Sequence, residues 1–126
     1  MESRCRILVA EDESIIAMDL KSSLSRMGYD VTSVVNNGLE AIQKTEEEKP
    51  DIILMDILLA GLLDGIEAAK IISFNHNVPI IYLSALNDDD TVERANINPS
   101  SMFIRKPYRE HDLKKAIELM LSRKHS

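Results

Sequence analysis

Short apolar runs alternate with longer amphipathic stretches along this chain, and this alternation constrains the fold more than any other feature. Such a pattern is typical of strand–helix–strand units that build a parallel sheet. Because most of the runs are apolar throughout, we expect strands covered by helices on both faces, and hence an α/β fold. The predicted strands are Ile7–Ala10, Val31–Val35, Ile52–Met55, Val78–Leu83 and Met102–Ile104.

The stretches between and after these runs predict helices. Apolar side chains recur at helical spacing from Ile15 to Met27, including Ile16, Met18, Leu20 and Leu24, and Gly28 then supplies a stop signal. A second helix is predicted to begin at Leu39 and to close within the polar run Thr45–Lys49, because Pro50 prevents its continuation. The remaining predictions are Gly65–Ser73, a short helix at Asp88–Asn96, and Glu110–Arg123 with Leu113, Ile117, Leu119 and Met120 facing inward.

Length and charge limit the classes of function. The 126 residues suit one domain, and we expect residues 1–126 to form it without an effector domain. A net charge of −6 argues against binding to nucleic acid or to an anionic membrane, so protein partners are expected. Cys5 is the only cysteine, and no apolar stretch approaches the roughly 18 residues of a membrane span. We therefore expect a cytoplasmic protein.

Reactive side chains follow four of the five predicted strands. Glu11 and Asp12 follow the first strand, Asp56 the third, Ser84 the fourth and Lys106 the fifth. In open parallel sheets, ligands bind beyond the carboxyl ends of the strands, so these side chains are expected to meet there. The second strand ends in two asparagines, to which no chemistry is assigned.

Three carboxylates brought together repel one another unless a cation lies between them. Mg²⁺ is the expected ion, because it prefers oxygen ligands and uses carboxylates together with phosphate oxygens. Beside such a cation and the Lys106 ammonium, the Asp56 carboxylate can attack a phosphoryl group and form an acyl phosphate. Ser84 would donate a hydrogen bond to one of the phosphoryl oxygens.

The motifs that carry these residues are "ILVAEDE", "DIILMDI", "DGIEAA", "IIYLSA" and "FIRKPY". In this order and at these strand ends, the chain resembles the receiver domains of two-component response regulators over essentially its whole length. The resemblance implies a flavodoxin-like, doubly wound, five-stranded parallel sheet with strand order 2-1-3-4-5.

The resemblance also implies roles for individual residues. Asp56 is the expected phosphoacceptor. Asp12, Asp56 and the backbone carbonyl of Leu58 are the expected direct Mg²⁺ ligands, and Glu11 is expected to act through water. Ser84 and Lys106 are expected to stabilise the phosphoryl group. The expected switch residues are Ser84 and Phe103, which lacks the hydroxyl of the more usual tyrosine, and a cis peptide bond is expected before Pro107.

In function, the resemblance implies a phosphorylation switch rather than an enzyme. A sensor histidine kinase or a histidine phosphotransfer protein would donate to Asp56, and the face formed by the fourth helix, fifth strand and fifth helix would then change and engage a downstream protein. A phosphorelay intermediate, and a receiver module cut from a larger kinase or regulator, remain alternatives.

Two departures from the family pattern bear on mechanism. The loop from Asp56 to Gly65 is about one residue longer than is common, and Ala60 stands where proline is frequent. Leu58 and Leu86 are apolar at positions that often hold polar groups near the attacking water. From the second departure we predict a long-lived phosphoryl group.

Taken singly, each of these residues has an ordinary structural explanation. Glu11 and Asp12 could cap the first helix, Ser84 could be a plain turn residue, and Lys106 could be a solvated lysine in a turn.

A Mg²⁺-dependent phosphohydrolase that uses Asp56 as a transient nucleophile is an alternative of another class, although no second acid or substrate pocket is apparent. A flavodoxin-like cofactor binder would need a phosphate-cradling loop after the first strand, which the sequence lacks.

Overall fold

The five strands lie side by side in one parallel sheet with the order β2-β1-β3-β4-β5, which confirms the predicted topology. The computed structural model describes residues 4–84 and 101–124. The strands are β1 (Arg6–Ala10), β2 (Asp30–Val35), β3 (Ile52–Asp56), β4 (Ile80–Ser84) and β5 (Ser101–Arg105). The predicted β4 began two residues earlier, at Val78. Pro79 has no N–H to donate, and the ladder begins after it.

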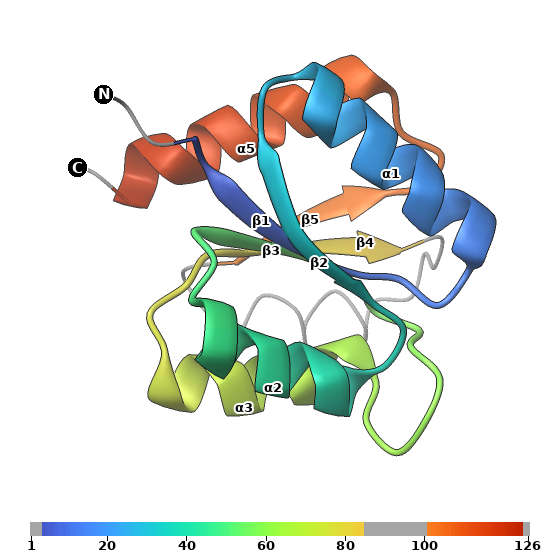
Figure 1. Ribbon diagram of the computed structural model, residues 1–126, viewed down its shortest axis with the longest axis vertical. Coiled ribbons are helices and arrows are strands. Elements are labelled where there is room, and N and C mark those ends of the chain that lie inside the picture. The colour runs from blue at the N-terminus through green and yellow to red at the C-terminus, as the bar shows by residue number, and fades with distance from the viewer. Residues whose placement is uncertain (1–3, 85–100, 125–126) are drawn as a thin grey trace.

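Helices cover both faces of the sheet, with α1 and α5 on one face and α2 and α3 on the other (Figure 1). Their bounds are α1 (Ser14–Arg26), α2 (Gly38–Glu48), α3 (Gly65–Asn75) and α5 (Glu110–Lys124). The helix predicted at Asp88–Asn96 lies outside the described residues, as does Leu86. In residues 4–84 and 101–124, no helix has the length and apolar character that crossing a bilayer requires.

Local sequence explains how several of these elements end. Gly28 follows α1 with a φ of +94°, a conformation that glycine adopts without strain. The side chain of Asn37 accepts a hydrogen bond from the Glu40 amide at 2.9 Å and so caps α2. Asp64 and Glu67 form a reciprocal capping box at the start of α3. The two caps set the direction in which α2 and α3 leave the carboxyl edge of the sheet, and Gly28 ends α1 before β2 begins.

Two apolar cores flank the sheet, because alternate residues of each strand point to opposite faces. The core beneath α1 and α5 includes Ile7, Leu20, Leu24, Leu54, Leu83 and Ile117, and the core beneath α2 and α3 includes Leu8, Ile53, Met55, Ile66, Ile72 and Tyr82. One predicted inward residue is wrong, since Leu119 on α5 is 47% exposed. Helical spacing also grouped Ile15 and Met18 with the buried side chains of α1, but both are exposed.

Strand order determines where the site lies. β1 is hydrogen-bonded to β2 on one side and to β3 on the other, so the sheet switches its winding direction between β1 and β3. The carboxyl ends of these two central strands therefore open onto the crevice in which such sheets bind ligands. Glu11 and Asp12 follow β1 directly, and Asp56 is the last residue of β3.

Candidate functional site

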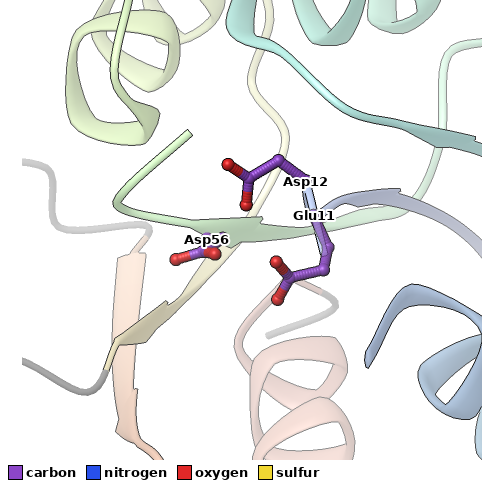
Figure 2. A group of neighbouring side chains, drawn as sticks. All are labelled: Glu11, Asp12 and Asp56. Atoms are coloured by element: carbon purple, nitrogen blue, oxygen red, sulfur yellow. The ribbon is translucent and has the colours of Figure 1, made fainter. Parts of the chain in front are cut away.

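The side chains of Glu11, Asp12 and Asp56 point toward one another at the carboxyl edge (Figure 2). One carboxylate oxygen from each residue lies within 4.8 Å of the others. The Glu11 side chain is fully buried and that of Asp56 is 7% exposed. Two of the three acidic groups are thus shielded from water, which would otherwise screen their charges, while Asp12 beside them is more exposed.

Glu11 shows the electrostatic cost of this arrangement. Burial raises the pKa of the Glu11 carboxyl above its ordinary value, and the hydrogen bond that it shares with Asp56 raises the pKa further. The Glu13 amide and Lys106 act in the opposite direction, with the Glu13 amide donating to Glu11 Oε2 at 3.1 Å. The net direction is upward, so a second positive charge at this site would favour the ionised carboxylate.

Lys106 is the cation that the structure brings to this group. Its Nζ donates to Glu11 Oε1 at 3.0 Å and to Asp56 Oδ2 at 3.4 Å. Burial alone would lower the pKa of Lys106, but the hydrogen bond to Glu11 and the charge of Asp56 outweigh burial and raise the pKa. The Lys106 amide donates to the Ser84 carbonyl at 2.8 Å, and the Lys106–Pro107 peptide bond is cis.

The Asp56 carboxylate is held from two directions. Oδ2 faces Lys106, whereas Oδ1 accepts a hydrogen bond from the Leu58 amide at 3.1 Å. The Ile57 amide donates to the Leu83 carbonyl at 3.1 Å and so ties the end of β3 to β4. Both carboxylate oxygens are therefore oriented by groups from different loops, which favours a fixed position for a nucleophile.

Ser84 and Phe103 occupy neighbouring strands beside Asp56. Asp56 pairs with Leu83 in the β3–β4 register, so the fully buried Ser84 lies one residue further toward the carboxyl edge. Phe103 pairs with Tyr82 across β4 and β5 and packs, partly buried, against the core beneath α2 and α3. Phe103 is thus separated from the acidic group by a strand.

The donor set fits Mg²⁺. The group offers oxygen ligands only, and one to three carboxylates at a surface-accessible edge suit an ion that retains several waters. A hollow of about 540 Å³ and another of about 300 Å³ adjoin the group, and Asp12 and Asn36 line both. Asp12 is therefore the most accessible of the three acidic residues, whereas Glu11 and Asp56 are buried.

Sequence reasoning missed three residues of this edge. Asn37, to which no chemistry was assigned, caps α2, and the residue type before a predicted helix could have indicated that role. Tyr108 follows Lys106–Pro107, and burial raises the pKa of its hydroxyl to about 12, with smaller contributions from the negative charges of Glu11, Asp19 and Asp56. Gly65 lies against the backbone of Asp56. In the sequence, Gly65 was distinguished only as the first residue of a predicted helix.

Comparison with known proteins agrees with this geometry. A family model described as the response regulator receiver domain matches residues 7–118. This chain belongs to the response regulator receiver domain family. Receiver domains are regulatory modules that bind Mg²⁺ through acidic residues and work with histidine kinases and downstream targets, and membership of this family is consistent with a phosphorylation-dependent signalling switch.

Individual relatives show the same likeness. The receiver is 40% identical over 118 residues to the transcriptional regulatory protein PdtaR of Mycobacterium tuberculosis, covering 94% of this chain and 57% of PdtaR. It is 36% identical over 104 residues to the chemotaxis protein CheY of Thermotoga maritima, covering 82% of this chain and 86% of CheY. The chain thus spans little more than half the length of PdtaR.

A solved structure matches closely in fold. The crystal structure of the signal receiver domain of a modulated diguanylate cyclase from Desulfovibrio desulfuricans G20 has a TM-score of 0.89 and 35% sequence identity, and the match covers 98% of both chains. The flavodoxin-like receiver fold is therefore shown for this chain.

Proposed function

We propose that Asp56 accepts a phosphoryl group from a histidine of a partner kinase or phosphotransfer protein. The observation that carries the proposal is the position of the Asp56 carboxylate, which lies beside Glu11 and Asp12 and 3.4 Å from the Lys106 ammonium that also contacts Glu11. A carboxylate in this setting is shielded from bulk water, oriented and adjacent to positive charge, as a nucleophile toward phosphorus requires.

Phosphoryl transfer to Asp56 exchanges a bond from phosphorus to nitrogen for a bond from phosphorus to oxygen. A carboxylate oxygen of Asp56 forms a bond to phosphorus, the phosphorus–nitrogen bond of the donor phosphohistidine breaks, and the electron pair returns to the imidazole nitrogen. Glu11, Asp12, Asp56 and the Leu58 carbonyl would hold Mg²⁺, which supplies charge neutralisation for the phosphoryl oxygens when bound. Lys106 and Ser84 would donate hydrogen bonds to the remaining phosphoryl oxygens.

The readout would pass through Ser84 and Phe103. A phosphoryl group adds a charge of about −1.5 to −2 beside Ser84, and drawing that hydroxyl toward the phosphoryl group gives the Phe103 ring space to move. Because Phe103 is only partly buried on β5, its movement would alter the surface at the β5 edge of the sheet. We propose that a downstream protein binds this surface, rather than nucleic acid, and that this occurs in the cytoplasm.

The donor protein would bind around the acidic group. Three large apolar side chains at this edge, Ile15, Met18 and Leu58, are 83%, 71% and 56% exposed. Exposed apolar side chains beside a reactive group are typical of a surface that a partner covers. Such a partner would place its histidine against Asp56 and exclude water during transfer.

The test is incubation of the purified protein with a small acyl-phosphate donor, with Mg²⁺ or with a chelator, followed by intact mass measurement. We expect the mass of one phosphoryl group to be added only with Mg²⁺, and none to be added to Asp56→Asn. Catalytic consumption of the donor without accumulation of phosphoprotein would instead indicate a phosphohydrolase. Equal labelling of Asp56→Asn would contradict the proposal.

A further inference from the structure

The β3–α3 loop returns the chain to Asp56, and Gly65 makes this approach close. A Cβ atom on Gly65 would lie 2.1 Å from the carbonyl oxygen of Asp56 and 2.9 Å from the Cα of Ile57. Carbon atoms of a protein do not approach backbone atoms so closely. The first residue of α3 can therefore lie here only because it has no side chain.

Hydrogen bonds fix Gly65 in this place. Its amide donates to the Ile57 carbonyl at 2.8 Å, so the start of α3 is joined to the backbone that follows the acceptor. The preceding residue, Asp64, accepts from the Glu67 amide at 2.8 Å, while the Glu67 side chain accepts from the Asp64 amide at 3.0 Å. This capping box holds the first turn of α3, and with it Gly65, in one orientation.

The loop is held at a second point as well. Ala60 forms a parallel β-bridge with Asn37, the residue that caps α2. Leu58 lies between the two attachments, at Ile57 on one side and at Ala60 on the other. Its amide is the group that donates to Asp56 Oδ1 at 3.1 Å. The direction of that amide therefore depends on where Gly65 holds the chain.

We propose that Gly65 is a positioning residue for phosphoryl transfer, acting through the Leu58 backbone on the orientation of the Asp56 carboxylate. This inference rests on the proposed function. An alanine at position 65 must move α3 away from Asp56 by about 1 Å to restore ordinary contact, and a misplacement of about 1 Å can lower the rate of a positioned reaction roughly 10²-fold. The hydrogen bond from the Leu58 amide would lengthen with the same shift.

The primary experiment compares Gly65→Ala with Gly28→Ala. Gly28 follows α1 with a φ of +94°, and a Cβ there would meet nothing within 4 Å, so Gly28→Ala strains the backbone at a site unrelated to Asp56. We expect both variants to lose stability. Only Gly65→Ala should show a phosphorylation rate, per folded molecule and at saturating Mg²⁺, that is lower by about 10²-fold.

A second variant keeps the test decisive if Gly65→Ala does not fold. Asp64→Ala breaks the capping box without adding a Cβ at position 65, and Lys44→Ala removes an exposed ion pair with Glu47 on α2 as a control. For Asp64→Ala we expect a smaller loss of rate and a change in the chemical shift of the Leu58 amide proton toward that of a solvent-exposed amide. Neither change is expected in Lys44→Ala or Gly28→Ala, because a loss of global stability alone does not move the Leu58 resonance.

The outcomes separate this inference from the proposed function. If the wild-type protein takes up no phosphoryl group, the proposed function fails, whatever Gly65 does to the Leu58 amide. The other case is a wild-type protein that is phosphorylated and a folded Gly65→Ala that reacts at the wild-type rate with an unchanged Leu58 resonance. That result overturns only the positioning role. If Gly65→Ala does not fold, the same result for Asp64→Ala overturns it.

Discussion

The two edges of the sheet both carry charged residues, but they use them differently. At the amino edge, the Arg6 guanidinium donates to the carbonyls of Glu48 and Lys49 at 2.6 and 3.2 Å, at the C-terminal end of α2. The Arg6 amide donates to Asp51 Oδ2 at 2.8 Å. At the carboxyl edge, by contrast, Glu11 and Asp56 share the single ammonium of Lys106, with Asp12 beside them.

The charges at the amino edge stabilise the fold, whereas the fold holds the like charges at the carboxyl edge close together. A guanidinium at the end of α2 satisfies carbonyls that the helix leaves unpaired and complements the helix dipole. Among the described residues, the carboxyl edge instead concentrates three carboxylates around one lysine, and the core strands on either side keep them there. Residual negative charge is what a cation site requires.

Removing the positive charge at each edge should give the largest effects. One variant should change the phosphorylation rate and the other the free energy of unfolding. Lys106→Gln should lower the rate of Asp56 phosphorylation by about 10²–10³-fold, as loss of one preorganised donor does in other enzyme sites. Arg6→Gln should leave that rate unchanged but lower the free energy of unfolding by about 1–3 kcal/mol, because α2 carbonyls lose their partner. Phosphorylation kinetics and urea denaturation measure the two effects, and similar rates for both variants would remove the distinction between the edges.

Magnesium should stabilise the protein only through the carboxyl edge. At ten times its dissociation constant, the ion should raise the free energy of unfolding by about 1.4 kcal/mol. Asp12→Asn should abolish this increment without lowering stability in the absence of Mg²⁺, because a repulsive charge is removed. Asp51→Asn, at the amino edge, is the matched control and should retain the increment. Thermal unfolding with and without Mg²⁺ tests this, and an increment that survives Asp12→Asn would contradict it.

The lifetime of the phosphoryl group should depend on Leu58. Its side chain is 56% exposed beside Asp56 and offers no group to orient water. Replacing Leu58 and Leu86 together by asparagine should shorten the lifetime about tenfold, less than the 10²-fold or more of a well-placed general base. Loss of label after donor removal measures the lifetime. An unchanged lifetime would mean that apolar side chains at these positions do not protect the phosphoryl group.

The smallest expected effect is on tyrosine ionisation. Burial raises the pKa of Tyr82 from 10.0 to about 12, with a contribution from Asp64, and burial also raises that of Tyr108 to about 12, with a contribution from Glu11. In each case the unfolded chain ionises first, so stability present below pH 10 is lost as the pH rises toward 12. Mg²⁺ should lower the pKa of Tyr108 but not that of Tyr82. Tyrosinate absorbance, measured with and without Mg²⁺ in Tyr82→Phe and in Tyr108→Phe, distinguishes the two residues.

The sequence predicted the strands and their order better than it predicted which apolar side chains are exposed. Apolar runs fixed the strands, since a strand buried on both faces must be apolar throughout. The rule for strand ends then placed Glu11, Asp12, Asp56 and Lys106 in one neighbourhood, which is where they lie, although their roles remain predictions. The exposure of Ile15 and Met18 was not predictable, because periodicity identifies an apolar side chain without showing whether a partner or the core covers it.

Details that depend on tertiary contact were also beyond the sequence. Gly65 appeared only as the first residue of a helix, and its contact with Asp56 arises because the loop turns back on β3. Tyr108 appeared only as part of a motif, and its raised pKa follows from the packing of the segment after β5 near Glu11. Spacing along a chain does not encode such approaches between distant segments.

We propose that the acidic group at the carboxyl edge is a divalent cation site that serves Asp56. Its most direct test is a crystal structure of the protein with Mn²⁺, which shares the preference of Mg²⁺ for oxygen ligands and is visible by anomalous scattering. We predict one strong anomalous peak within about 2.5 Å of carboxylate oxygens of both Asp12 and Asp56. A peak elsewhere, or none at Mn²⁺ concentrations that support phosphorylation, would contradict the account.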